Sequence, residues 1–190
     1  MRIIAGEHKG RRIAPPSGRD TRPMLDRVRE ALFSTLGEVV DEALVLDLFA
    51  GTGSLGLEAL SRGAAHAHFV ERDPRAVRIL NDNIVTLRVT AVEVVRDDAL
   101  EPRSWSAEDG PAANVVFVDP PYLMLREAAE KARLLETIQC LYETVLRPGG
   151  VLVLHAHPRD LHEETLESIA PVDRRVYGNS ALAYLWKGEG

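Results

Sequence analysis

The chain has 190 residues, of which 45% are hydrophobic and 27% are charged. This length allows one domain of ordinary size with a small appendage, and the composition is globular rather than disordered, collagenous or membrane-spanning. No apolar run approaches the ~20 residues of a membrane helix, and the N-terminus has no stretch long enough for a signal-peptide core, so we expect a cytoplasmic protein. The single cysteine, Cys140, excludes an intramolecular disulfide and a cysteine-based zinc cluster.

The formal net charge of −6 taken by itself argues against a nucleic-acid partner, but the charge is unevenly placed. Residues 1–22 hold six basic and two acidic side chains, which gives +4. Residues 23–190 hold 17 basic and 27 acidic side chains, which gives −10. The protein is therefore a basic arm on an acidic body, and the arm either binds nucleic acid or merely aids solubility.

Glycines and prolines punctuate the arm, and short apolar pieces flank its basic turn, GEHKGRR. This pattern predicts a small β-hairpin followed by a loop, with the basic side chains projecting from it. We accordingly divide the chain into a basic N-terminal hairpin extension, residues 1–22, and a main domain, residues 23–190.

The first helix of the main domain is predicted from about Pro23 to Leu36. Apolar residues recur there at helical spacing, and Gly37 ends the pattern. Asp20 or Thr21 is the expected cap of this helix.

From residue 44 onward, short apolar runs alternate with amphipathic segments. This alternation predicts an α/β fold with a mainly parallel sheet covered on both faces by helices. The last two strands are joined by only a short turn, so they should form an antiparallel hairpin at one end of the sheet. The expected strands are 44–49, 67–70, 91–95, 115–118, 151–155, 171–176 and 182–187, and the expected helices are 55–62, one that begins at Pro74, a long one that ends near Leu146, and 160–168.

Notable residues follow four of these strands, and ligands of open α/β sheets bind beyond the carboxyl ends of the strands. After the first strand, Gly51, Gly53 and Gly56 have G-x-G-x-x-G spacing. Glycines let the backbone turn sharply and approach a ligand, and the following helix offers free N–H groups. This spacing fits a dinucleotide site, another nucleoside cofactor, or only a tight strand–helix turn.

Three carboxylates accompany this glycine turn. Asp47 lies within an otherwise apolar strand, where a carboxylate is costly unless it is paired or orients a ligand. Glu71 ends the second strand and can accept hydrogen bonds from both ribose hydroxyls of either NAD or S-adenosylmethionine. Asp98 can accept from an adenine amino group while the Ala99 N–H meets a ring nitrogen, or Asp98 can cap a helix. Both interpretations of Asp98 stay open.

The fourth strand end distinguishes between these cofactors. Two prolines in Asp119-Pro120-Pro121-Tyr122 stiffen the backbone and remove N–H donors, which leaves carbonyl oxygens facing outward. Acceptors beside an aromatic ring suit a planar base that carries an amino group, because the acceptors hold the amine hydrogens and Tyr122 stacks on the ring. A dehydrogenase has no obvious use for this arrangement, so it favours methyl transfer to an amine.

The segment VLDLFAGTGSLGLEALSRGA, the later VERD and the DPPY motif together resemble the class I S-adenosylmethionine-dependent methyltransferases that act on amines. With RIIAGEHKGRRI and TRPMLDRVREALFSTL at the N-terminus, the chain resembles the RsmD family, which methylates the N2 amine of one guanine in bacterial 16S ribosomal RNA. The resemblance runs from residue 2 to about residue 155. It implies a Rossmann-like class I methyltransferase fold, with a mainly parallel seven-stranded sheet and an antiparallel last strand.

The resemblance also implies roles for individual residues. Asp47, Gly51 and Gly53 would surround the methionine part of the cofactor, Glu71 would bind its ribose, and Asp98 would face the adenine. The residues expected to bind S-adenosylmethionine are Asp47, Phe49, Gly51, Gly53, Glu71, Arg72, Asp98 and Ala99. The residues expected to hold the target guanine and to catalyse transfer are Asp119, Pro120, Pro121 and Tyr122. Residues expected to contact RNA phosphates are Arg2, Lys9, Arg11, Arg12, Arg19, Arg22 and Arg27.

One position departs from the family pattern. A threonine usually follows the Arg-Pro pair, whereas this chain has Met24, so no hydroxyl is available there. The expected partner is 16S ribosomal RNA, within the small ribosomal subunit or its assembly intermediate. The enzyme is expected to be a monomer that binds no metal and no membrane.

Two alternatives stay open. A DNA adenine-N6 or cytosine-N4 methyltransferase fits DPPY equally, although the compact chain has no evident target-recognition domain. The more distant alternative is a protein that transfers no methyl group, either an NAD-linked oxidoreductase or an RNA-binding assembly factor. We interpret His155 and His157 as solvated or capping histidines, because no third ligand has convincing metal spacing.

Overall fold

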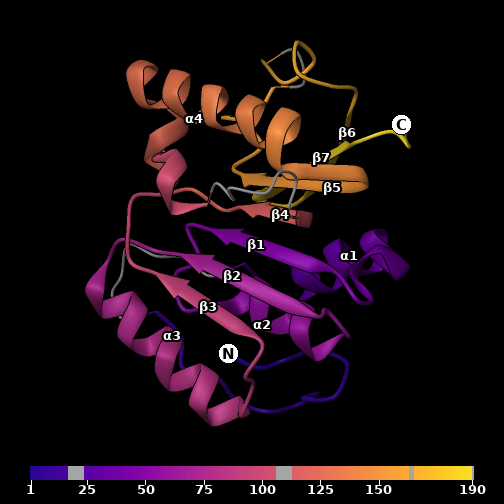
Figure 1. Ribbon diagram of the computed structural model, residues 1–190. Coiled ribbons are helices and arrows are strands. Elements are labelled where there is room, and N and C mark those ends of the chain that lie inside the picture. The colour runs from indigo at the N-terminus through magenta and orange to yellow at the C-terminus, as the bar shows by residue number, and fades with distance from the viewer. Residues whose placement is uncertain (17–23, 106–112, 163–164, 190) are drawn as a thin grey trace.

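A seven-stranded β-sheet forms the centre of the protein (Figure 1). The computed structural model describes residues 1–16, 24–105, 113–162 and 165–189. The strands in chain order are β1 (Leu44–Leu48), β2 (His66–Val70), β3 (Val92–Val95), β4 (Ala113–Val118), β5 (Leu146–Ala156), β6 (Val172–Tyr177) and β7 (Ser180–Trp186).

The strand order is β3-β2-β1-β4-β5-β7-β6. The pairs among β1 to β5 are parallel, whereas β7 is antiparallel to both β5 and β6. The predicted mainly parallel sheet with an antiparallel last strand is therefore confirmed. Because the first five strands run in one direction, their carboxyl ends meet at a single edge of the sheet. The turn between β6 and β7 lies at this same edge, since Ala156 at the end of β5 pairs with Ala181.

Helices cover both faces of the sheet, as predicted (Figure 1). Val45 of β1 and Val115 of β4 lie in one buried cluster with α1, α2 and α3, while their neighbours Leu46 and Val116 lie in a second cluster with α4. This alternation follows from the two-residue period of a strand. The helices are α1 (Asp26–Leu36), α2 (Ser54–Ser61), α3 (Pro74–Leu87) and α4 (Ala128–Cys140), and the short helical turns are η1 (Gly37–Val40), η2 (Pro102–Ser104), η3 (Tyr122–Leu125) and η4 (Leu141–Val145).

Helix α3 shows how local sequence sets a helix boundary. The Asp73 side chain accepts a hydrogen bond from the Arg75 N–H at 2.8 Å, and Pro74 occupies the first helical position. The helix ends at Leu87, and its C-cap residue Arg88 adopts a left-handed conformation with φ of 61°. The sequence therefore predicted the start of this helix correctly.

The start of α1 differs from the prediction. The helix begins at Asp26, and Leu25 stands at its N-cap without a side-chain cap. The expected caps, Asp20 and Thr21, lie outside the described residues. Met24 is buried in the same apolar cluster as α1, which gives an apolar side chain a structural place at this position.

The long helix predicted to end near Leu146 is confirmed in its extent. Helix α4 ends at Cys140 and continues directly as the π-helix η4 to Val145, and Leu146 pairs with Ala113 as the first residue of β5. The Lys187 ammonium group donates to the carbonyls of Tyr142, Glu143 and Leu146 and so caps the end of the helical segment. The Arg-Pro-Gly-Gly segment forms an irregularity inside β5 rather than a turn before the strand.

The helix predicted over residues 160–168 is also wrong. The described residues of this span form turns. The Arg174 guanidinium donates to the carbonyls of Pro158 and Leu161, and the apolar side chains of Leu161 and Leu166 are both buried. These tertiary contacts hold the segment as a loop against the sheet.

The N-terminal arm forms a minimal hairpin. Arg2 and Arg12 make one antiparallel bridge, and the N–H groups of Ile3 and Ile13 donate to the arm's own carbonyls at 3.0 and 3.1 Å. Ile3 and Ile13 are buried in the cluster that contains α1 and α2. The arm is therefore packed onto the body. Within the described part of the chain, no helix combines the length and apolar character required to cross a membrane.

Candidate functional site

Three carboxylates meet at the carboxyl edge of the sheet. Asp47 lies on β1, and the pairing of Leu48 with Val70 and with Val118 places Glu71 and Asp119 on its two sides. Asp47 is 1% exposed, and its Oδ2 accepts the Gly56 N–H at 2.8 Å. The structure therefore brings the predicted residues of the first, second and fourth strand ends together at one edge of the sheet. Among the residues that the structure describes, no three histidine, cysteine or acidic side chains gather so as to hold a metal ion.

The environment of Asp47 is unusual for a carboxylate. Burial raises the pKa of Asp47 well above its usual range, the Gly56 N–H opposes this shift, and the negative charges of Asp119 and Glu71 add to it. In the described part of the chain, no basic side chain pairs with Asp47. A ligand that carries positive charge would relieve this arrangement.

The glycine turn brings the backbone close to this carboxylate. Gly53 has a φ of 81°, and a Cβ there would lie 2.3 Å from Leu80 Cδ1. A Cβ at Gly56 would lie 2.3 Å from the Phe69 ring and 3.1 Å from Asp47 Oδ2. Only glycine therefore permits this approach of α2 to β1 and β2. Gly51, also with positive φ, completes the turn.

Phe49 has a φ of 58°, which is rare for an aromatic residue. Such conformations persist where the surrounding structure fixes them, and they cluster at functional sites. Here the next residue, Ala50, donates its N–H to the Val70 carbonyl at 3.0 Å and so ties the turn to β2. The predicted cofactor residue Phe49 thus lies in the bend between β1 and the glycine turn.

Glu71 joins the glycine turn to the end of β2. Its Oε2 accepts the Gly51 N–H at 2.8 Å, and its Oε1 accepts the Asp73 N–H at 2.7 Å. Each carboxylate oxygen has a second lone pair that can accept from a ribose hydroxyl. The carboxylate is therefore already oriented, with acceptor capacity left for a ligand.

The loop after β3 carries Asp98. Its Oδ1 accepts the Leu100 N–H at 3.1 Å, and its Oδ2 lies 3.9 Å from the exposed guanidinium of Arg72. The capping interpretation thus applies to a turn before η2 rather than to a helix. Ala99 is buried, and its carbonyl accepts the Trp105 indole N–H at 3.0 Å. Contact of Asp98 and Ala99 with adenine stays a prediction.

The DPPY motif extends from β4 into η3. The Asp119 N–H donates to the Leu48 carbonyl at 3.3 Å, and the Asp119 side chain is 31% exposed. Pro120 is buried and Pro121 is exposed. The Pro121 carbonyl accepts the Met124 N–H at 2.9 Å, so this oxygen does not face outward as predicted. Asp119 and the Pro120 carbonyl remain the expected acceptors for the amine.

His155, at the carboxyl end of β5, is a site residue that the sequence interpretation missed. Its Nδ1 lies 2.7 Å from Asp119 Oδ1, and its side chain is 3% exposed, so its interpretation as a solvated or capping histidine is wrong. Burial opposes the charged imidazole, but the charge of Asp119 and the hydrogen bond outweigh it and raise the pKa of His155. The available signal was the position of His155 at the end of the strand that follows the DPPY strand.

The Tyr122 ring contacts two histidine rings. Its centroid is 6.0 Å from that of His155 and 6.3 Å from that of His157, with interplanar angles of 67° and 83°. These are edge-to-face arrangements, which fix the direction of the aromatic plane. The predicted stacking ring is therefore held beside the predicted acceptor Asp119.

The predicted RNA-binding residues fall into three groups. Lys9, Arg12 and Arg27 are exposed, and Arg2 is exposed with its Nε 3.3 Å from Asp26 Oδ2. Arg11 instead donates to the carbonyls of Thr86 and Leu87 at the end of α3 and so holds the arm on that helix. The remaining two, which lie outside the described residues, are Arg19 and Arg22.

Buried polar groups that the sequence interpretation did not identify attach the arm to the body. Glu58 of α2, fully buried, accepts the N–H groups of Ile4 and Ala5 at 2.7 and 3.0 Å. The fully buried Arg29 donates to the Arg2 carbonyl at 2.5 Å. These contacts place the arm directly against α1 and the helix that follows the glycine turn.

Asn83 of α3 links the arm to the glycine turn. Its side chain accepts the Ala14 N–H at 2.7 Å and donates to the Ala14 and Thr52 carbonyls at 3.1 and 3.0 Å. The side chain is 2% exposed, so these bonds are shielded from water. One amide therefore joins the end of the described arm to the predicted cofactor turn.

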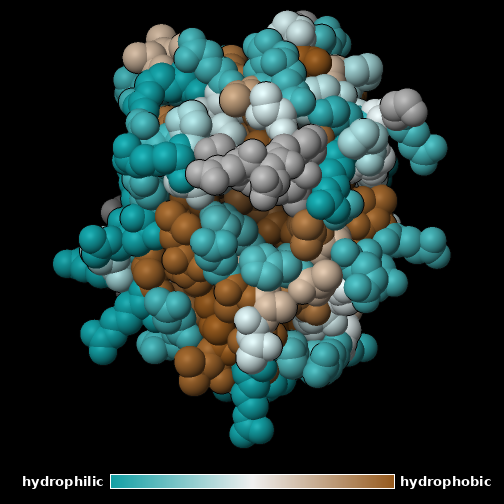
Figure 2. Space-filling view, in the orientation of Figure 1, coloured by the Kyte–Doolittle hydropathy of each residue, from teal (hydrophilic) through white to brown (hydrophobic). Residues whose placement is uncertain are grey.

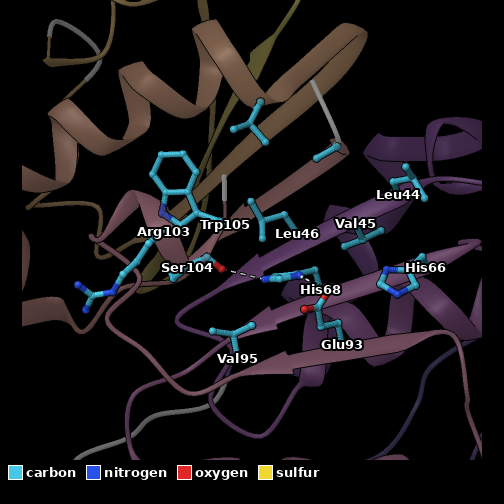
Figure 3. A pocket seen from close by; sticks show the side chains of 12 residues that line it. Leu44, Val45, Leu46, His66, His68, Glu93, Val95, Arg103, Ser104 and Trp105 are labelled. Atoms are coloured by element: carbon cyan, nitrogen blue, oxygen red, sulfur yellow. Dashed lines mark hydrogen bonds and ion pairs between the residues drawn. The ribbon is translucent and has the colours of Figure 1, made fainter. Parts of the chain in front are cut away.

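A cavity of about 390 Å³ lies against β1, β2 and β3, and its lining extends from Leu44 and His66 at the amino ends of β1 and β2 to Val95 at the carboxyl end of β3. His68 points into it and bonds Glu93 at 3.1 Å and the Ser104 carbonyl at 2.9 Å (Figure 3). On this face of the molecule, Figure 2 shows mostly hydrophilic side chains with an apolar area in the lower half. The cavity contains none of the predicted site residues.

Comparison with known proteins gives consistent matches along the whole chain. The family described as "Conserved hypothetical protein 95" matches residues 1–186. "Putative rRNA methyltransferase YlbH" of Bacillus subtilis is 35% identical over 191 residues, which cover 100% of both chains. "Ribosomal RNA small subunit methyltransferase D" of Escherichia coli is 45% identical over 122 residues, which cover 64% of this chain and 60% of that protein. The solved structure of "Putative methyltransferase yhhF" from Escherichia coli superposes with a TM-score of 0.80 at 35% identity, covering 100% of this chain and 99% of that one.

Proposed function

The chain belongs to the family described as conserved hypothetical protein 95, the RsmD family of methyltransferases, and on this basis we propose that it methylates the exocyclic N2 amine of a guanine in 16S ribosomal RNA. The methyl donor is S-adenosylmethionine. The observation that carries the proposal is the meeting of the Asp47–glycine turn, Glu71 and DPPY at one sheet edge. Family membership favours this function over an NAD-linked oxidoreductase.

The residues at this edge fit S-adenosylmethionine. The turn at Gly51 and Gly53 admits a ligand close to the backbone, and Glu71 retains acceptor capacity for a ribose. The buried Asp47 lies near two further carboxylates, and a cationic ligand would relieve their mutual repulsion. When bound, S-adenosylmethionine supplies an electrophilic methyl group on a positively charged sulfur.

Asp119 and the Pro120 carbonyl would accept the hydrogens of the guanine amine. The amine is a poor nucleophile because its lone pair is delocalised into the ring, and these acceptors favour its pyramidalisation and stabilise the positive charge that develops on nitrogen. Asp119 and the Pro120 carbonyl would thereby hold the nitrogen lone pair toward the methyl group that S-adenosylmethionine would supply, with the sulfur as the neutral leaving group. The excess proton then passes from nitrogen to the Asp119 carboxylate and on to water.

Tyr122 would stack on the guanine and hold it against these acceptors. Transfer needs nitrogen, carbon and sulfur nearly in line, so positioning of the base contributes much of the rate. The two histidine rings beside Tyr122 fix the plane on which the base would lie. A flipped or unpaired guanine is the substrate that can reach such a ring.

The exposed cations of the arm would bind the RNA backbone. Lys9 and Arg12 project from the hairpin, and Arg27 projects from α1 near the turn that holds Gly178. Phosphate contacts of this kind position a protein on nucleic acid and make its binding salt-dependent. We place the reaction in the cytoplasm, on 16S ribosomal RNA within the small ribosomal subunit or its assembly intermediate, with the enzyme acting as a monomer.

The test is methylation of defined substrates with radiolabelled S-adenosylmethionine. Under-methylated small-subunit particles, free 16S ribosomal RNA and duplex DNA are compared, and the modified base is mapped. We expect label on the N2 atom of one guanine in 16S ribosomal RNA. Label only on DNA would favour the adenine or cytosine methyltransferase alternative, and particle binding without transfer would favour an assembly factor.

A further inference from the structure

We infer that His155 is a positioning residue for methyl transfer, which holds the Asp119 carboxylate and the Tyr122 ring in the arrangement that receives the guanine. The inference rests on the proposed function. Its basis is a buried imidazole that contacts two residues of the DPPY motif from the neighbouring strand.

The sheet register brings His155 to Asp119. Val118 of β4 pairs with Leu154 of β5, so the next residue on each strand lies at the carboxyl edge. The His155 Nδ1 to Asp119 Oδ1 distance is 2.7 Å, a short hydrogen bond typical of a charged acceptor. The donor is 3% exposed and the acceptor 31% exposed. A rigid, buried group therefore holds a carboxylate whose outer side faces the site.

The hydrogen-bond pattern assigns the proton to Nδ1. The opposite ring nitrogen, Nε2, is buried and has no hydrogen-bond partner among the described residues. A proton on Nε2 alone would leave a buried donor unpaired and Asp119 without a donor, which is costly. Both the neutral Nδ1–H form and the imidazolium therefore donate to Asp119. The contact fixes one carboxylate oxygen and leaves the other to accept from the amine.

The same ring also contacts the stacking residue. The His155 and Tyr122 rings meet edge to face with centroids 6.0 Å apart. His155 also pairs with the apolar residue Leu182 of β7, and the His157 ring lies 6.3 Å from the Tyr122 ring. In the described part of the chain, Asp119 is the charged residue that forms a hydrogen bond with His155. One imidazole sets the separation between the amine acceptor and the aromatic plane.

The test compares His155→Leu with His155→Asn in steady-state methylation of small-subunit particles. Leucine removes the donor, so we expect kcat to fall about 10- to 100-fold with little change in the KM for S-adenosylmethionine. Asparagine keeps an N–H donor close to the backbone, so we expect kcat within about threefold of the wild type. His66→Leu, the same substitution at the opposite edge of the sheet, is the matched control. Wild-type kcat in His155→Leu, or equal losses in both His155 variants, would overturn the inference.

A second measurement separates this inference from the proposed function. Long-range ¹⁵N NMR of the full chain reports the tautomer and the titration of His155 without any RNA. We expect a proton on Nδ1 and a pKa above the usual 6.5, which falls in Asp119→Asn. A proton on Nε2, or a titration that Asp119→Asn leaves unchanged, would contradict the positioning contact. Inactive wild-type enzyme with the expected NMR behaviour would refute the proposed substrate and retain the contact.

Discussion

Two buried carboxylates, Asp47 at the sheet edge and Glu58 beneath the arm, show how the site differs from the scaffold. Glu58 receives two backbone N–H groups and the Arg62 guanidinium at 2.8 Å, with Arg29 at 3.8 Å. Asp47 receives the N–H of Gly56 and lies near other carboxylates. A buried carboxylate that accepts several hydrogen bonds from the protein stabilises the fold. A buried carboxylate with no positively charged partner indicates a binding site for a cationic ligand.

The largest expected effect separates chemistry from folding. Asp119→Ala removes the acceptor for the guanine amine, so methyl transfer to small-subunit particles should fall by at least about 10²- to 10³-fold. Affinity for S-adenosylmethionine, measured by isothermal titration calorimetry, should stay close to that of the wild type. Full activity in this variant would contradict the assignment of Asp119.

A loss of stability, rather than of catalysis, is expected when the buried carboxylate Glu58 beneath the arm is changed. Glu58→Gln removes one of the two carboxylates beside the buried Arg29, while Asp26 at 3.1 Å remains, and it weakens the acceptor of two backbone N–H groups, so the free energy of unfolding in urea should fall by about 1–3 kcal/mol. The exposed Glu38→Gln is the matched control and should change stability by less than about 0.5 kcal/mol. A stable Glu58→Gln protein would show that the arm does not depend on this buried cluster.

Asp47→Asn should have opposite effects on stability and on cofactor binding. Asparagine can still accept the Gly56 N–H and carries no charge, and we expect affinity for S-adenosylmethionine to fall about tenfold or more. Burial raises the pKa of Asp47 in the folded state, so the folded protein holds this proton more tightly than the unfolded chain does. Without ligand, the free energy of unfolding of the wild type therefore falls as the pH rises from the unfolded pKa to the raised folded pKa. The fall is about 1.4 kcal/mol for each unit by which the pKa is raised. The variant lacks this loss, so it should gain stability relative to the wild type across that range. Urea unfolding of both proteins at acid and at neutral pH measures the difference between their free energies of unfolding. A difference that is the same at both pH values would refute the argument that burial raises the pKa of Asp47.

A smaller effect is expected from the exposed cations of the arm. Replacing Lys9 and Arg12 by alanine should reduce the slope of log affinity for RNA against log salt by about 1–2 while leaving S-adenosylmethionine binding unchanged. Lys131→Ala, on α4 at the other face of the sheet, is the matched control. An unchanged slope in the double variant would favour the solubility interpretation of the arm.

Much of the site could be predicted because its residues follow strands that local pattern identifies. The glycine turn, Glu71 and DPPY each follow an apolar run, and parallel topology brings such ends together without further information. His155 was missed because its role depends on the register of β5 against β4, which joins residues 36 positions apart. Likewise, the described residues of the helix predicted over 160–168 form turns, and Arg174 on a later strand donates to the Leu161 carbonyl within this span and to the Pro158 carbonyl before it.

The sequence by itself determined the α/β class, the strand ends that carry chemistry, and the basic character of the arm. These features depend on local periodicity and composition, which need no knowledge of distant partners. Only the tertiary structure decided which cations of the arm are available, because Arg11 is used to bind the carbonyls of α3 while Lys9 and Arg12 stay exposed. It also decided which buried carboxylate has its charge compensated, since the two backbone donors to Glu58 come from residues more than 50 positions away in the chain.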